Sequence, residues 1–119
     1  MNQRTALGKR GEDMACRFLG TLGWEVIERN WRCARGEIDI VARDGGTIVV
    51  VEVKTRSSLG AGHPFEAITP QKLARLKLLA GEWCRERRPG SPLVRVDAVA
   101  VLMPRNQPAV VDHLRDITR

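Results

Sequence analysis

The sequence GEIDIVARDGGTIVVVEVKTR, at residues 36–56, constrains the fold more than any other part of the chain. Two apolar runs rich in Val and Ile, at residues 37–42 and 47–55, flank an Asp-Gly-Gly turn that begins at Asp44. Branched side chains favour strands, and Asp-Gly between apolar runs is a strong hairpin signal because both residues tolerate positive φ. The segment therefore predicts two antiparallel strands joined by a tight turn.

Charged side chains interrupt both predicted strands at alternating positions. In the first strand they are Glu37 and Asp39. Successive side chains of a strand point to opposite faces, so these two carboxylates share one face while Ile38 and Ile40 take the other. The apolar face must pack on the core.

The second strand places Glu52 and Lys54 on one face, opposite Val49, Val51 and Val53. A hairpin loop of two or four residues pairs odd-numbered residues of the first strand with even-numbered residues of the second. All four charged side chains then lie on the same side of the sheet. A loop of three or five residues would break this parity unless a bulge restored it.

Three carboxylates gathered beside one lysine repel one another, and a divalent cation relieves that repulsion. Mg²⁺ takes one or two carboxylates and leaves its other positions to water and phosphate oxygens. Such an ion can lower the pKa of water and stabilise charge on phosphorus, while Lys54 could orient the attacking water or neutralise phosphate. The same residues could instead form a ladder of salt bridges on a solvated sheet face. The run at residues 49–53 favours the metal site, because it is typical of a central strand buried on both faces, where unpaired charge is costly.

The rest of the chain predicts an α/β fold. The remaining elements, in chain order, are a helix at residues 6–22, a strand at 24–29, a helix capped by Thr69 with Pro70 in its first turn, and strands at 93–103 and 108–114. The segment SSLGAGHPF, at residues 57–65, is expected to be a mobile loop. The order αβββαβ(β) in a chain of 119 residues indicates one domain, with helices packed against a mixed β-sheet.

The first predicted helix supplies one more candidate ligand. Glu12 lies on a stripe with Gly8, Ala15 and Leu19, at the margin of the face that should be buried. Asp13 falls on the face that should be solvated. We therefore expect Glu12, and not Asp13, to reach the site.

The composition of the chain indicates which binding partners and which cellular compartment to expect. The net charge of +6 and the sequence pI near 10.0 favour a polyanionic partner, although the same charge could serve solubility alone. The first 13 residues are too polar for a signal peptide, and no apolar run approaches a membrane span, so a cytoplasmic protein with no membrane partner is expected. Cys16, Cys33 and Cys84 lack a CxxC pair and are expected to be buried free thiols.

Several other side chains have both a functional and a structural interpretation. Arg56, one strand step beyond Lys54, could contact phosphate or lie at a wet strand end, and His63 could activate water or lie at the surface. Trp31, between two polar residues, is the most plausible exposed aromatic for stacking on bases, whereas Trp24 and Trp83 suit the core. A basic helical face could track phosphates or be simply solvated; it comprises Lys72, Arg75, Arg85, Arg87 and Arg88.

The hairpin residues resemble the PD-(D/E)xK nuclease superfamily, in which one hairpin strand carries an Asp and the next carries Glu/Asp-x-Lys. More closely, GKRGEDMACRFLGTLGW, RGEIDIVARDGGTIVVVEVKTR and ITPQKLARL are similar to the YraN-type uncharacterised bacterial family, which itself resembles archaeal Holliday-junction resolvases. The resemblance spans roughly residues 7–112. It implies a restriction-endonuclease-like fold and Mg²⁺ or Mn²⁺ as cofactor.

By this resemblance Asp39 and Glu52 take the places of the metal-binding carboxylates, and Lys54 that of the catalytic lysine. Glu12 matches a glutamate that resolvase-like members place on their first helix, and Gln71 falls where many members carry a polar residue. Two features depart from the wider superfamily pattern: Ile38, not Pro, precedes the Asp, and Glu37 is an additional acid. Glu37 could bind metal or pair with Lys54 or an Arg.

The resemblance therefore leads to three hypotheses of different classes. The first is a metal-dependent endonuclease that hydrolyses DNA and selects branched structures by shape, because one small domain lacks obvious elements for reading base sequence. The second is a non-catalytic nucleic-acid-binding module of the same fold, and the third is a protein-interaction adaptor. A homodimer would let an enzyme cut two strands symmetrically, and the sequence leaves the oligomeric state open.

Overall fold

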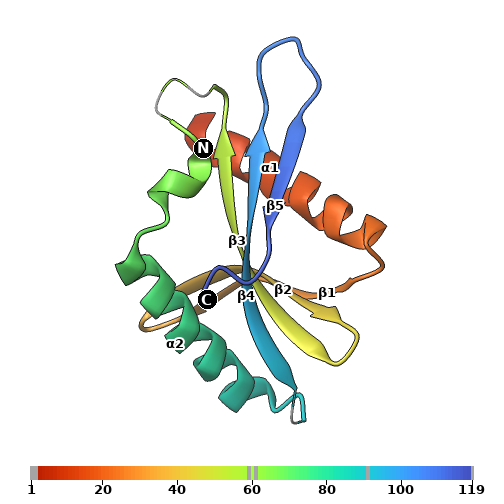
Figure 1. The fold of residues 1–119 in the computed structure, drawn as a ribbon, viewed down its shortest axis with the longest axis vertical. Coiled ribbons are helices and arrows are strands. Elements are labelled where there is room, and N and C mark those ends of the chain that lie inside the picture. Colours follow the sequence, from red (N-terminus) through yellow and green to blue (C-terminus); the bar gives the residue numbers. More distant parts are fainter. Residues whose placement is uncertain (1–2, 59, 61, 91, 119) are drawn as a thin grey trace.

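The computed structural model describes residues 3–58, 60, 62–90 and 92–118. Figure 1 shows a twisted sheet with one long helix on each side. The elements in chain order are α1 (Gln3–Thr21), β1 (Glu25–Cys33), β2 (Gly36–Asp44), β3 (Thr47–Arg56), the short 3-10 helix η1 (Pro64–Ala67), α2 (Pro70–Arg87), β4 (Leu93–Leu102) and β5 (Val110–Leu114). This order confirms the predicted α/β fold class, although α1 starts earlier and β1 ends later than expected.

The five strands form one mixed sheet in the order β1-β2-β3-β4-β5. Only β3 and β4 pair in parallel, and the other neighbours are antiparallel. The central position of β3 explains its sequence, since Val49, Val50 and Val51 are fully buried. The C-terminal strand β5 lies at one edge of the sheet, as predicted.

The core is divided between the two faces of the sheet. On one face, α1 contributes Ala15 and Leu19 to a cluster that includes Trp24 and Val51. On the other face, α2 packs against the sheet with buried residues that recur at helical spacing; they are Leu76, Leu79, Ala80 and Trp83. The first half of α1 and the first turns of α2 line hollows on either side of Lys54 in β3.

The prediction of an exposed Trp31 was wrong. Its side chain is 5% exposed and packs in the cluster beneath α2, opposite Ile38 on the neighbouring strand. Alternation along β1 puts Trp31 on the opposite face from its polar neighbours, and α2 covers that face. Trp24 and Trp83 are core residues, as expected.

The β2–β3 hairpin has the predicted even-numbered loop. Asp44 pairs with Thr47, which leaves Gly45 and Gly46 as the two loop residues, and the ladder continues in register to the pair Ile40–Val51. Gly45 has a φ of +59°, a conformation that the first position of a tight hairpin turn requires and glycine adopts without strain. The turn therefore fixes the register on which the site prediction depends.

The expectation that Ile38 and Ile40 share one face is corrected by the structure. Ile38 belongs to the cluster beneath α2, whereas Ile40 belongs to the cluster beneath α1. The regular β2–β3 ladder ends at Ile40, so the strict alternation of a paired strand does not extend to residues before it. Asp39 lies at this transition between the two faces.

The first helix approaches β3 closely at Gly11. A Cβ atom at Gly11 would lie 2.0 Å from Thr55 Oγ1 and 2.8 Å from Thr55 Cβ, so only glycine fits between the helix and the strand. Gly11 therefore sets the distance between α1 and the end of β3 that carries Lys54.

The second helix begins as its sequence predicts. Thr69 is the N-cap and its Oγ1 accepts a hydrogen bond from the backbone N–H of Lys72, while Pro70 occupies the first turn. The helix ends at Arg87, and the C-cap Arg88, whose φ is +48°, reverses the chain. Leu59 and Ala61, in the segment expected to be a mobile loop, lie outside the described residues.

Two further sequence expectations concern the cysteines and membranes. Cys16, Cys33 and Cys84 are free thiols as expected, but each is only partly buried. Neither described helix has the length and apolar content that a membrane span needs.

Candidate functional site

The site forms where β2 and β3 stop pairing. Beyond the pair Ile40–Val51, the carboxylate of Asp39 accepts a hydrogen bond from the backbone N–H of Val53 at 2.8 Å. This N–H lies in the central strand and takes the Asp39 side chain as its partner beyond the last pair of the ladder. The fold thereby holds one carboxylate in the gap between the strands.

The second carboxylate, Glu52, adjoins the first. The pKa of the Asp39 carboxyl is raised from 3.8 to about 7. Burial is the largest cause of this rise, and repulsion by Glu52 is the next. The ionised form of Asp39 is therefore destabilised in this partly dry site, which is the electrostatic condition that a divalent cation relieves.

Lys54 completes the predicted group from the same strand. Its Nζ lies 3.7 Å from Glu52 Oε1, and both side chains are mostly buried, with exposed fractions of 18% and 21%. The structure thus brings together Asp39, Glu52 and Lys54, as the hairpin parity predicts.

Glu12 reaches the same pocket from α1 but has partners of its own. Its Oε1 accepts hydrogen bonds from Arg29 Nε at 2.9 Å and from Asn30 Nδ2 at 3.0 Å. Asp13, the neighbouring acid, pairs with the Arg29 guanidinium at 2.7 Å and is more exposed. Glu12 therefore faces the pocket, as expected, while β1 neutralises its charge.

Glu37 pairs with an arginine and not with the lysine. Its Oε2 accepts a hydrogen bond from Arg32 Nε at 2.9 Å across the β1–β2 pair. Arg56 donates to the backbone oxygen of Thr55 at 3.0 Å. No carboxylate of the described chain lies within salt-bridge distance of Arg56, so its charge is available to a ligand.

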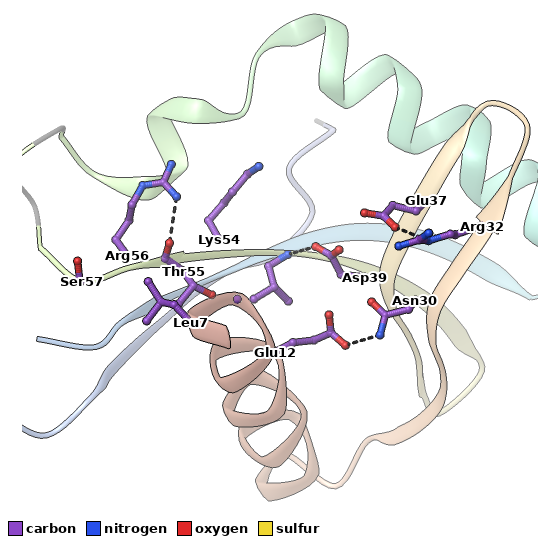
Figure 2. A pocket seen from close by; sticks show the side chains of 12 residues that line it. Leu7, Glu12, Asn30, Arg32, Glu37, Asp39, Lys54, Thr55, Arg56 and Ser57 are labelled. Carbon is purple, nitrogen blue, oxygen red and sulfur yellow. Dashed lines mark hydrogen bonds and ion pairs between the residues drawn. The ribbon is translucent and has the colours of Figure 1, made fainter. Parts of the chain in front are cut away.

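A pocket of about 660 Å³ lies between α1 and the strands β1, β2 and β3, and its lining includes Glu12, Asp39 and Lys54 but not Glu52. Figure 2 shows Glu12, Asp39, Lys54 and Arg56 around this hollow, with Asn30 and Arg32 beside Glu12 and Asp39 on the side away from Arg56. The pocket thus combines acids that can hold a cation with basic groups that can face a phosphate.

A second pocket of about 280 Å³ lies on the α2 side of the same carboxylates. It shares Glu37, Asp39 and Lys54 with the first pocket and adds Glu52, Lys72 and Arg75. Of the basic helical face, Lys72 and Arg75 therefore approach the site, while Arg85 and Arg87 pair with acids elsewhere. Gln71 is exposed on the first turn of α2 and lines neither pocket.

Sequence reasoning missed the contribution of β1. Arg29, Asn30 and Arg32 all contact acids of the site region. Asn30 has a φ of +55°, which an asparagine adopts more readily than most residues. The available signal was an Asn directly after the strand expected at residues 24–29, but its pairing with α1 joins residues far apart in sequence.

His63 lies away from the paired carboxylates. Its Nδ1 accepts the backbone N–H of Phe65 and its Nε2 lies 3.2 Å from Asp112 Oδ2. His63 therefore caps η1 and contacts β5, and its predicted alternative role in activating water has no geometric support.

The metal expectation rests on two carboxylates. Among the side chains that the structure describes, no three His, Cys, Asp or Glu residues are grouped so as to hold a metal ion. Asp39 and Glu52 nevertheless offer hard oxygen donors, and their mutual repulsion fits an ion that completes its coordination with water and phosphate. Glu12 would bind the metal ion directly only by releasing Arg29 or Asn30, and otherwise only through a bridging water.

Fold and site together define a small α/β protein with a five-stranded mixed sheet, which carries two carboxylates and a lysine where two strands part. The chain belongs to the family described as "Uncharacterised protein family UPF0102", which matches residues 11–101. This confirms the expected YraN-type family.

Close relatives match almost the whole chain. A UPF0102 protein of Beutenbergia cavernae is 55% identical over 117 residues, covering 98% of this chain and 99% of its own. One from Pseudarthrobacter chlorophenolicus is 52% identical, covering 98% and 89%. A third, from Streptomyces griseus, is 52% identical over 120 residues, covering 99% and 100%. The relatives establish the family, and the chemistry must be argued from the site.

Proposed function

We propose that this protein is a metal-dependent nuclease that hydrolyses phosphodiester bonds of DNA, with Mg²⁺ or Mn²⁺ held by Asp39 and Glu52. The observation that carries the proposal is the pairing of these two carboxyls in a partly buried gap. Burial, and after it repulsion by Glu52, raises the pKa of Asp39 to about 7, and Lys54 lies beside Glu52. Structural salt bridges tend to lower the pKa of their acids, so an acid held at a raised pKa is a feature of functional sites.

Each residue of the site has a specific task in this proposal. Asp39 and Glu52 supply oxygen ligands, and the bond from the Val53 N–H fixes the orientation of Asp39. Lys54 Nζ, close to Glu52, neutralises the phosphate and orients the attacking water. When bound, the cation lowers the pKa of water and stabilises negative charge on the phosphoryl oxygens.

The surroundings of the site support DNA as the substrate. Arg56 lines the pocket on one side, and Lys72 and Arg75 line the α2 side. Cationic side chains of this kind bind phosphates irrespective of base sequence. Selection of DNA by shape, including branched forms, is therefore part of the proposal.

The decisive experiment is cleavage of labelled duplex, single-stranded, flapped and four-way-junction DNA with Mg²⁺, Mn²⁺ or EDTA. Asp39→Asn and Lys54→Ala should each reduce the rate by at least about 100-fold, because they remove a cation ligand and a phosphate contact. Matched controls are Glu25→Gln and Lys77→Ala, which change exposed side chains away from both pockets. They should cut like the wild type.

Equal cutting by all five proteins would mean that a contaminant is responsible, and the nuclease proposal would fail. Cutting that persists in EDTA would contradict the role of the cation. Cleavage of RNA in preference to DNA would show that the substrate is RNA and not DNA.

A second candidate, a nucleic-acid-binding module without catalysis, is favoured by the engagement of Glu12. Because Arg29 and Asn30 already bond to its carboxylate, the site has two available acids and not three. This candidate predicts tight DNA binding with no cleavage in any metal, and binding that Asp39→Asn leaves unchanged. The DNA panel above separates the two functions.

A further inference from the structure

A third pocket, of about 1270 Å³, lies beside the candidate site and is the larger of the two hollows along α1. The first turns of α1 form one wall, and the β4–β5 connection forms the other. Figure 1 shows this connection at the same end of the molecule as the start of α1. We call this pocket the flanking groove.

The flanking groove is continuous with the site pocket. Leu7 and Ser57 line both hollows, so a ligand that leaves the site past Arg56 enters the groove directly. The α2-side pocket adjoins the site from the opposite direction, through Glu37, Asp39 and Lys54. The paired carboxylates therefore lie between two flanking hollows and not at the closed end of one.

The charges of the flanking groove favour an anion. Lys9 and Arg10 come from α1 and Arg105 from the β4–β5 connection. Among the described residues of the lining, the one acid is Asp13, which is paired with Arg29 at 2.7 Å. Within the described chain, no carboxylate lies within salt-bridge distance of the three basic groups, so their charge is not cancelled inside the protein.

The lining also indicates which part of the nucleic acid would be bound. It contains no aromatic side chain among the described residues, so bases have no surface on which to stack. The amide side chains of Asn106 and Gln107 add hydrogen-bonding groups beside Arg105. Such a surface suits the phosphate backbone, whose binding is independent of sequence.

We propose that the flanking groove binds the DNA backbone on one side of the phosphate at the Asp39–Glu52 site, through Lys9, Arg10 and Arg105. This inference rests on the proposed function, because it takes the DNA path through the candidate site. With Lys72 and Arg75 on the other side, the protein contacts DNA in both directions from the site. Cleavage should then be internal and should not require a DNA end.

The test measures binding without cleavage. Fluorescence anisotropy of a labelled 20-base-pair duplex and a matching single strand, in EDTA and over a series of salt concentrations, gives the affinity and its salt dependence. The double variant Arg10→Ala/Arg105→Ala should weaken binding about 10- to 100-fold and reduce the slope of log affinity against log salt by about 2, or slightly less for the single strand.

The matched control is Arg35→Ala/Arg85→Ala, which removes the same charge. Both of these arginines pair with Glu82, far from the groove, and are well exposed. The control should change affinity less than about threefold and leave the slope unchanged. Circular dichroism of each protein verifies that it is folded.

The outcomes separate this inference from the nuclease proposal. Loss of affinity in the groove variant only, with no cleavage in any metal, would support the groove and refute the nuclease. If the groove variant keeps the wild-type slope of log affinity against log salt, the flanking groove does not bind the DNA backbone, even if the protein cuts DNA. A loss confined to RNA of the same length, or no binding by the wild type at low salt, would also refute it.

Discussion

The Asp39 carboxylate accepts the backbone N–H of Val53 at 2.8 Å, at the point where β2 and β3 cease to pair. One side chain therefore has two tasks, because it satisfies a backbone donor of the central strand and is also half of the candidate cation site. A substitution that removes the whole side chain would abolish the hydrogen bond to Val53 and the negative charge together, so their effects could not be separated. Asp39→Asn separates them, since the amide oxygen can still accept the N–H while the charge is lost.

The first prediction concerns stability against pH. The pKa of Asp39 is raised to about 7 by burial and by Glu52, against 3.8 for the free side chain. Between these values the folded protein binds more protons than the unfolded chain, so the free energy of unfolding falls as the pH rises from about 4 to about 7. In Asp39→Asn this fall should largely disappear. At pH 8 the free energy of unfolding of the variant should therefore exceed that of the wild type by on the order of 2 kcal/mol.

Urea unfolding in EDTA, at intervals from pH 5 to pH 8.5, checks this prediction. Glu25→Gln, an exposed acid at the start of β1, is the control and should follow the wild-type profile. Parallel profiles for wild type and Asp39→Asn would show that Asp39 is ionised throughout the range and that its environment is wetter than the structure indicates.

The second prediction concerns added cations. An ion that binds the ionised carboxyls competes with the proton on Asp39, so Mn²⁺ should stabilise the wild type more at pH 8 than at pH 5.5. At a concentration 100 times the dissociation constant, the gain is about 2.7 kcal/mol. Thermal unfolding with and without Mn²⁺ measures it, and Asp39→Asn should lose most of the gain. Equal gains in both proteins would place the ion elsewhere.

The third prediction concerns the contact between α1 and β3. Gly11→Ala should destabilise the protein by about 1–3 kcal/mol, because the new Cβ overlaps Thr55 and this outweighs the better helix propensity of alanine. Gly20→Ala is the control, since a Cβ there meets nothing within 4 Å, and it should be neutral or slightly stabilising.

Chemical unfolding of the double variant Gly11→Ala/Thr55→Ala completes this test. Removing Thr55 Oγ1 and Cγ2 relieves the two shortest overlaps and leaves Thr55 Cβ at 2.8 Å, so part of the stability should return. Strictly additive effects would mean that the helix moves away from the strand instead of clashing with it.

The site core could be predicted because local sequence fixes it. The turn at Asp44 sets a two-residue loop, the loop sets the register, and the register places Asp39 near Glu52 and Lys54. Each of these steps involves residues close together in the chain. The same locality explains why the cap of α2 at Thr69 was predicted correctly.

The features that sequence could not give depend on packing between distant elements. Burial of Trp31 requires knowing that α2 covers that face of β1. The neutralisation of Glu12 requires the contact of α1 with Arg29, seventeen residues later. The different faces of Ile38 and Ile40 follow from the end of the β2–β3 ladder, which strand periodicity does not reveal.

The last prediction concerns Asp97, which is fully buried in β4, where it pairs with Val51 of β3. Its carboxylate accepts hydrogen bonds from Arg95 at 2.9 Å and from the backbone N–H of Asp116 at 2.9 Å, and it lies 2.8 Å from His113 Nε2. These bonds tie β4 to β5 and to the segment that follows β5. Asp97→Ala leaves buried donors and a cation without their acceptor, so we expect a loss of about 3–5 kcal/mol.

Asp44→Ala is the matched control, because Asp44 approaches the same Arg95 at 3.7 Å from a more exposed position, and it should cost less than about 1 kcal/mol. Urea unfolding measures both losses. Hydrogen exchange should show faster opening of residues 113–118 in Asp97→Ala than in the control, since their anchor is gone. Equal protection of this segment in both variants would show that the contact between Ile117 N–H and Val96 O holds it without Asp97.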